Sequence, residues 1–171
     1  MLQTGKMYDS NQITLTYLEG KPIWWLVKTI SAKTNNKEED IYALLENEEY
    51  IDTLIEKYWF ITDEIKNKDI YYPLEGYLFP DTYAIANKDT KPEEIFEKML
   101  DKMESVLEPY KEEIEESKYN AHELLTLASI IETEGTNDND RKNVASVFYN
   151  RLDAGMSLGS DVTTYYSVKE D

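Results

Sequence analysis

The 171-residue chain contains no cysteine, which excludes a disulfide framework, a thiolate metal site and a thiol nucleophile. His122 is the only histidine, so a site built from several imidazoles is excluded as well. Basic residues are scarce: 18 Lys and Arg stand against 35 Asp and Glu, for a formal net charge of −17. Because phosphate backbones attract basic surfaces, this charge argues against nucleic acid as a partner.

Long apolar runs are also missing. No stretch reaches the roughly 18 residues that a membrane-spanning helix needs, and Met1 does not begin a signal peptide. A hydrophobic fraction of 41% and 14 tyrosines nevertheless indicate a globular protein with a real core, in one domain or two small ones. The sequence has no G-x-S-x-G elbow, phosphate-binding glycine loop or calcium-binding D-x-D-x-D-G loop.

The first part of the chain has the pattern of a small α+β module. Residues 12–18 alternate in polarity like a strand, and a turn follows at Gly20. Helices are predicted over residues 22–32, around residues 41–45 and after Asn47. We expect this module to occupy residues 1–70 and a second, mainly helical domain to occupy residues 71–171.

Residues 74–83, L-E-G-Y-L-F-P-D-T-Y, fit no helical period. They predict an extended segment with a turn at Pro80-Asp81. Glu75 is a carboxylate inside an apolar stretch, which makes it a candidate site residue. A strongly periodic helix follows, and Thr90 with Glu93 has the form of a capping box at its start.

The most distinctive helix signal lies between residues 120 and 135. Asn120 and Glu123 have the spacing of a capping box, so a helix should begin at Ala121. Gly135 can adopt the left-handed conformation that ends a helix. A further helix is predicted from Asp138 or Asp140 to Gly155, with Val144, Phe148 and Leu152 as its apolar stripe, and residues 156–171 are predicted to be loop and strand.

Glu132 is the candidate catalytic residue of the predicted 121–134 helix. Helical spacing places it on one face with Leu125, Ala128 and Ser129. If that face is buried, the pKa of the carboxyl rises, and a carboxylic acid still protonated near neutral pH is a general acid. The alternative is that Glu132 ends a core helix and reaches water, as acidic residues generally do.

The inventory of Glu132, Glu75, Asp161, Asn150 and tyrosines suits carbohydrate, since amides and carboxylates bind sugar hydroxyls and aromatic rings stack on sugar faces. Ordinary glycosidases need two carboxyl groups, about 5–5.5 Å apart when retaining and about 6.5–9.5 Å apart when inverting. A hydrolase that uses Glu132 with Glu75 or Asp161 is therefore one alternative, and it would release reducing ends.

Three blocks, residues 74–83, 127–134 and 144–163, resemble the YceG-like (MltG) endolytic murein transglycosylases in order and spacing. The resemblance implies a LysM-like subdomain over residues 1–70. It also implies a YceG-like catalytic domain from residue 71, of which the chain holds the N-terminal part. Relatives of this kind are bacterial enzymes with one N-terminal transmembrane anchor, here upstream of the chain, and an extracytoplasmic catalytic part.

The resemblance implies cleavage between N-acetylmuramic acid and N-acetylglucosamine in peptidoglycan glycan strands, without a cofactor. The muramyl 6-hydroxyl attacks in place of water and leaves a 1,6-anhydro end, while one glutamate serves as acid and then base. By its place in the motif that residue is Glu132. Substrate-binding roles carry over to Glu75, Asn150, Asp161 and Thr163, and peptidoglycan synthases are the further partners suggested.

The chain departs from the family pattern L-Q-(S/T)-D-P-T at Gly159 and Val162, which replace an amide side chain and a proline. A looser 158–163 loop is expected from both changes. The family's catalytic domain also continues beyond the position of Asp171. A non-catalytic peptidoglycan-binding or scaffold module with the same fold is therefore the second alternative.

Overall fold

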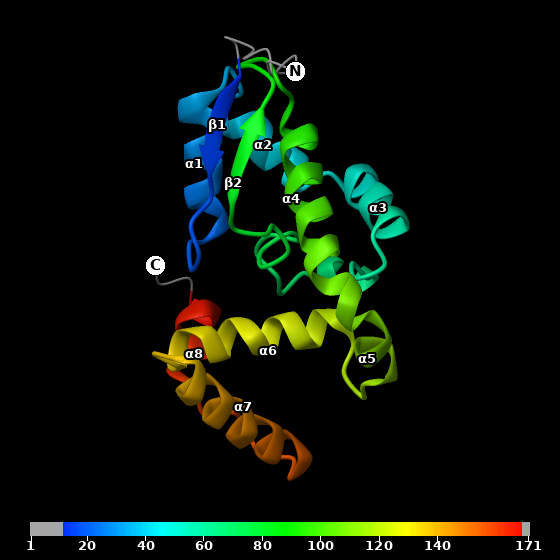
Figure 1. Cartoon of the computed structure of the whole chain (residues 1–171), viewed down its shortest axis with the longest axis vertical. Helices are drawn as coiled ribbons and strands as arrows, with labels where there is room; N and C mark the ends of the chain where they lie inside the picture. The colour runs from blue at the N-terminus through cyan, green and yellow to red at the C-terminus, as the bar shows by residue number, and fades with distance from the viewer. Residues whose placement is uncertain (1–11, 169–171) are drawn as a thin grey trace, which may run out of the picture. The chain divides into compact units, whose positions relative to one another are not determined.

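The computed structural model describes residues 12–168. The chain divides into two compact units, Met1–Ser117 and Lys118–Asp171, each with its own packing (Figure 1). The described part is mostly helical and contains one two-stranded sheet, which confirms the α+β class.

In the first unit, β1 (Ile13–Thr16) pairs antiparallel with β2 (Thr82–Ile85), with Leu15 opposite Tyr83. Figure 1 shows these two strands side by side although 65 residues separate them. Strand β2 lies after the module boundary that was predicted at residue 70. The compact unit therefore extends past that boundary, because strand pairing ties residues 82–85 to the first strand.

The helices of this unit follow the predicted order. They are α1 (Ile23–Lys33), α2 (Glu38–Leu45), α3 (Glu48–Lys57), α4 (Pro92–Leu107) and α5 (Lys111–Glu116), with short 3₁₀ turns at Asp63–Lys66 and Glu108–Tyr110. Asn47 caps α3 by accepting a hydrogen bond from Tyr50 N at 2.9 Å. These local signals were sufficient because caps and helical periodicity act within a few residues.

Two predictions for the first unit are wrong. Lys91, not Thr90, is the N-cap of α4, and it makes no side-chain cap. The Thr90 hydroxyl instead accepts from Asn87 N at 3.3 Å, within the turn that precedes the helix. The extended segment predicted over residues 74–83 is wrong at its start, where residues 73–77 form consecutive turns because the buried Leu74 and Tyr77 pull the chain onto the core, and right at its end, where Thr82 and Tyr83 lie in β2.

The second unit contains α6 (Ala121–Glu134), α7 (Asp138–Asp153) and α8 (Asp161–Val168). Its buried centre is the cluster Leu127, Ile130 and Phe148, against which Ile131, Val144 and Leu158 pack. The capping box of α6 is confirmed. Asn120 Oδ1 accepts from Glu123 N at 3.0 Å, and Glu123 Oε2 accepts from Asn120 N at 2.9 Å.

Two predictions for this unit are corrected. Residues 161–168 form a helix rather than a strand. The β-branched residues there suggested a strand, but the hydroxyl and N–H of Thr163 both bind Ser160 O, which begins a helical turn. Gly135 ends α6 in an extended conformation, with φ of −102°, and not in the left-handed one.

Candidate active site

The face of α6 that carries Glu132 is exposed. Ala128, Ser129 and Glu132 all lie in solvent, whereas Leu127 and Ile130, on the other side of the helix, are buried. The sequence shows an apolar run around most of the helix, so it did not reveal which side meets Phe148 of α7. Glu132 is thus exposed in the described structure, as the alternative in which its side chain reaches water expected.

Glu134, the last residue of α6, makes the contact that joins this helix to the rest of the site. Its Oε1 accepts a hydrogen bond of 2.6 Å from the hydroxyl of Ser160, which is only 4% exposed. One residue, Thr133, separates Glu132 from Glu134, so the two carboxylates leave the helix about 200° apart. The sequence analysis did not predict the contact between Glu134 and Ser160. The only available signals were the second glutamate of E-T-E and the serine before Asp161.

The chain reaches Ser160 through a defined turn after α7. Met156 N donates to Arg151 O at 2.8 Å, and Gly155 N donates to Leu152 O at 3.0 Å. With Gly155 at φ +66°, this is a Schellman motif. It reverses the chain, so that Leu158 packs on the central cluster and Ser160 arrives at the end of α6.

The other predicted residues of this unit lie on its surface. Asn150 is exposed on α7, and Asp161 and Thr163 are exposed in the first turn of α8. Figure 1 shows α8 beside the C-terminal end of α6, in agreement with the contacts between the two helices. Among residues 12–168, the side chains of Glu132, Asn150 and Asp161 have no hydrogen-bond or ion-pair partner, so their polar atoms face solvent.

Glu75 belongs to the first unit. Both of its carboxylate oxygens accept from Ile23 N, each at 3.1 Å, so the side chain caps α1, for which Pro22 provides no side-chain cap. Burial raises the pKa of Glu75, and the hydrogen bond from Ile23, which favours the ionised form, only partly offsets this. The contact explains a carboxylate in an apolar stretch, and its predicted role in binding substrate stays a prediction.

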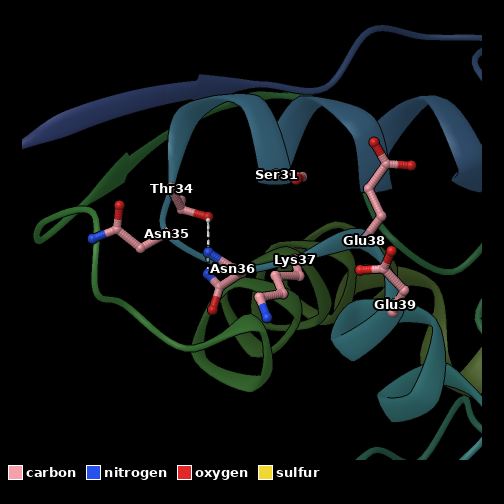
Figure 2. A pocket seen from close by; sticks show the side chains of 7 residues that line it. All are labelled: Ser31, Thr34, Asn35, Asn36, Lys37, Glu38 and Glu39. Carbon is pink, nitrogen blue, oxygen red and sulfur yellow. Dashed lines mark hydrogen bonds between the residues drawn. The ribbon is translucent and has the colours of Figure 1, made fainter.

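A polar surface depression lies in the first unit, where α1 ends and α2 begins (Figure 2). Its lining is used to close the turn between these helices. Asn36 Nδ2 donates to the Thr34 hydroxyl at 2.9 Å and to Thr90 O at 2.8 Å, and Asn35 Nδ2 donates to Asp89 at 2.6 Å. These contacts account for the amides of the depression as structural groups.

Over residues 12–168, no group of three or more His, Asp or Glu side chains is arranged to hold a metal ion. In the same span, every helix is too short or too polar to cross a membrane.

Sequence comparison defines the family of this chain. The profile of the YceG-like family matches residues 1–171, and the chain belongs to this family. An endolytic murein transglycosylase of Bacillus subtilis (strain 168) is 40% identical over 167 residues, which are 97% of this chain and 46% of that protein. A Streptococcus pneumoniae serotype 2 (strain D39) protein with the same name is 35% identical over 161 residues, or 90% of this chain and 29% of that protein.

A solved structure of a YceG-like protein is also similar to this chain. The 2.6 Å crystal structure of a YceG-like protein from Listeria monocytogenes has a TM-score of 0.84 and 35% sequence identity to this chain. The match covers 92% of this chain and 52% of that one. The chain thus spans about half the length of the crystallised protein and less than half the length of these two curated relatives.

Proposed function

We propose that this chain forms part of an endolytic peptidoglycan transglycosylase that cleaves glycan strands between N-acetylmuramic acid and N-acetylglucosamine. The names of the two curated relatives support the reaction class. The observation that carries the proposal is the end of α6, where the Glu134 carboxylate is bonded to Ser160 and the exposed Glu132 carboxylate leaves the other side of the helix.

In the proposed reaction one glutamic acid donates its proton to the glycosidic oxygen as the bond to muramyl C1 breaks. The same carboxylate then accepts the proton of the muramyl 6-hydroxyl, whose oxygen bonds to C1. The products are a free N-acetylglucosamine hydroxyl and a 1,6-anhydro end. No water is consumed, and the glutamate returns to its starting protonation state.

Glu132 is the residue that the family motif suggests for this role, and its exposure leaves both carboxylate oxygens open to a substrate. Glu134 is a second candidate, favoured by its hydrogen bond to the buried Ser160. That bond occupies one oxygen and fixes the position of the other, and a fixed position is what proton transfer to a bound substrate requires. One of the two glutamates is the acid/base and the other a neighbouring group.

Asn150, Asp161 and Thr163 are proposed to bind the sugar hydroxyl and acetamido groups. The exposure of all three supports this role, together with the place of the last two beside Ser160. Glu75 is proposed to contribute to substrate binding as part of the segment over residues 74–83. The βαα arrangement of β1, α1 and α2 supports a LysM-like module at the start of the chain. Extracytoplasmic action is proposed from the peptidoglycan substrate, and attachment of the catalytic part to the cell membrane is proposed only from the resemblance to the family.

Mass spectrometry of digested peptidoglycan tests the proposal. The proteins are this chain and a chimera in which the C-terminal remainder of the Bacillus subtilis relative follows Asp171. Each is made as wild type, Glu132→Gln and Glu134→Gln. The matched control is Glu123→Gln on the same helix, which keeps an amide oxygen for the capping box.

Anhydromuramyl ends from either wild-type protein, lost in one of the two glutamine variants and kept in Glu123→Gln, would support the proposal and identify the acid/base. Reducing ends would instead indicate a hydrolase with two carboxylates. If neither wild-type protein released any product while glycan strands still sedimented with the chain, the non-catalytic binding module would be the better description.

A further inference from the structure

We propose that Arg151 is a positioning residue, which holds the Leu158–Ser160 loop in place so that Ser160 stays on Glu134. The inference deepens the proposed function and rests on it where activity is concerned. The contact chain itself runs from α7 through Arg151, Leu158 and Ser160 to α6, and it lies entirely within the second unit.

Arg151 holds the loop from two atoms. Its guanidinium Nη1 donates to Leu158 O, and its own carbonyl accepts from Met156 N at 2.8 Å. The side chain is half-buried, and it forms no ion pair with an Asp or Glu anywhere in residues 12–168. A guanidinium that donates to a loop carbonyl, rather than to one of the many carboxylates of the chain, is a structural anchor for that loop.

Gly159 makes the close approach of the guanidinium to the loop possible. Its φ is +63°, which L side chains rarely adopt, and a Cβ built on it would lie 3.0 Å from Arg151 Nη1. The guanidinium therefore lies directly against the peptide backbone between Leu158 and Ser160. Where the family pattern has an amide side chain, this chain has Gly159, and the Arg151 guanidinium lies against it.

The loop has few other attachments. Leu158 is half-buried at the edge of the central cluster, and Ser160 reaches Glu134 through one hydrogen bond of 2.6 Å. Asp161 and α8 begin at the next residue, so any movement of the loop is transmitted to the first turn of α8. Arg151 thus acts on the reaction through the positions of Ser160 and Asp161, without touching the substrate.

The test compares Arg151→Met and Arg151→Lys with Lys142→Met, an exposed site on the same helix whose backbone oxygen accepts from the Ser146 hydroxyl. The first measurement is ¹⁵N relaxation of residues 158–160 in the intact chain. In Arg151→Met the loop order parameters should fall from about 0.85 to below about 0.6, while the α6 and α7 amides keep their chemical shifts. Arg151→Lys should lie between, because an ammonium reaches one carbonyl but lacks the planar fork.

The second measurement is the rate of anhydromuramyl product release, together with sedimentation of the chain with glycan strands. Arg151→Met should lower the rate by up to about 100-fold, the cost of a roughly 1 Å misplacement. Binding to glycan strands should change less than about twofold, and Lys142→Met should match wild type. A loop that stays rigid in Arg151→Met overturns the proposal, as does a mobile loop with an unchanged rate. If even wild type and the chimera released no product, the proposed function would fail, and the relaxation data alone would decide whether Arg151 holds the loop.

Discussion

Ser160 and Glu134 lie 26 residues apart in the sequence, and the hydroxyl of the first donates a 2.6 Å hydrogen bond to the carboxylate of the second. The bond joins the end of α6 to the start of α8, and the serine is almost completely buried. A buried hydroxyl needs a partner, since an unsatisfied one costs free energy. Glu134 is thereby a fixed point of the second unit, whichever glutamate carries the chemistry.

Replacing Ser160 with alanine removes this bond. We expect the free energy of unfolding to fall by about 1–2 kcal/mol, because the bond involves a charged group and the lost hydroxyl is buried. The measurement is urea denaturation followed by far-UV circular dichroism, which reports helix content and needs no tryptophan in the second unit. Ser146→Ala, an exposed serine bonded to Lys142 O, is the matched control and should change the free energy by less than about 0.5 kcal/mol. Equal effects at the two sites would contradict a special role for Ser160.

Glu75 should make the stability of the first unit depend on pH. Burial raises the pKa of its carboxyl from the ordinary value of 4.5, so in the folded state it binds a proton at pH values where the unfolded chain has lost it. Its contribution therefore favours folding below pH 4.5 and is lost as the pH rises through the folded pKa. The unfolding free energy of wild type minus that of Glu75→Gln should accordingly fall across this window.

The measurement is urea denaturation at several pH values from about 4 to 7, where the other carboxyl groups of both proteins titrate alike. Glu56→Gln, at an exposed glutamate of α3, is the control for the change from acid to amide and should not reproduce this fall. A difference between wild type and Glu75→Gln that rises with pH would show that the hydrogen bond from Ile23, which favours the carboxylate, outweighs the burial.

Asn120→Ala tests the capping box of α6. The Asn120 side chain accepts from Glu123 N, and the Glu123 carboxylate accepts from Asn120 N. Replacing an N-cap residue with alanine lowers the free energy of unfolding by about 1 kcal/mol. For a chain of this length that is a fall of about 2–4 °C in Tm. Asn139→Ala, an exposed asparagine in the first turn of α7, should leave Tm within about 1 °C. An unchanged Tm in Asn120→Ala would mean that tertiary packing alone sets the start of α6.

Sequence patterns predicted many of the locally determined parts of this fold, although not the cap of α4 or the helix α8. The Asn120 cap, the Asn47 cap and the helical periods all act within one turn of helix, and each was confirmed. The pairing of β1 with β2 and the bond between Ser160 and Glu134 join distant segments, so no pattern within a short window contains them. For the same reason the sequence left open which face of α6 is buried, because only the position of Phe148 in the folded unit decides it.

Gly135→Ala tests the corner between α6 and α7. The glycine has φ −102° and ψ 124°, a conformation open to any residue, so backbone strain does not explain it. A Cβ would instead lie 2.5 Å from Arg141 Cγ and 2.9 Å from Arg141 N. Because a backbone nitrogen cannot move aside alone, the corner must open, and overpacking of this kind costs about 1–3 kcal/mol.

The double variant Gly135→Ala with Arg141→Ala separates the two contacts. Removing the Arg141 side chain relieves the approach to Cγ but leaves the one to the backbone, so urea denaturation should show only partial recovery of the free energy of unfolding. Arg141→Ala alone should cost little, since its ion pair with Asp138 is exposed and 3.7 Å long. Full recovery of the free energy of unfolding would show that the loss comes entirely from the Arg141 side chain. A Gly135→Ala variant as stable as wild type would show that the corner is not closely packed.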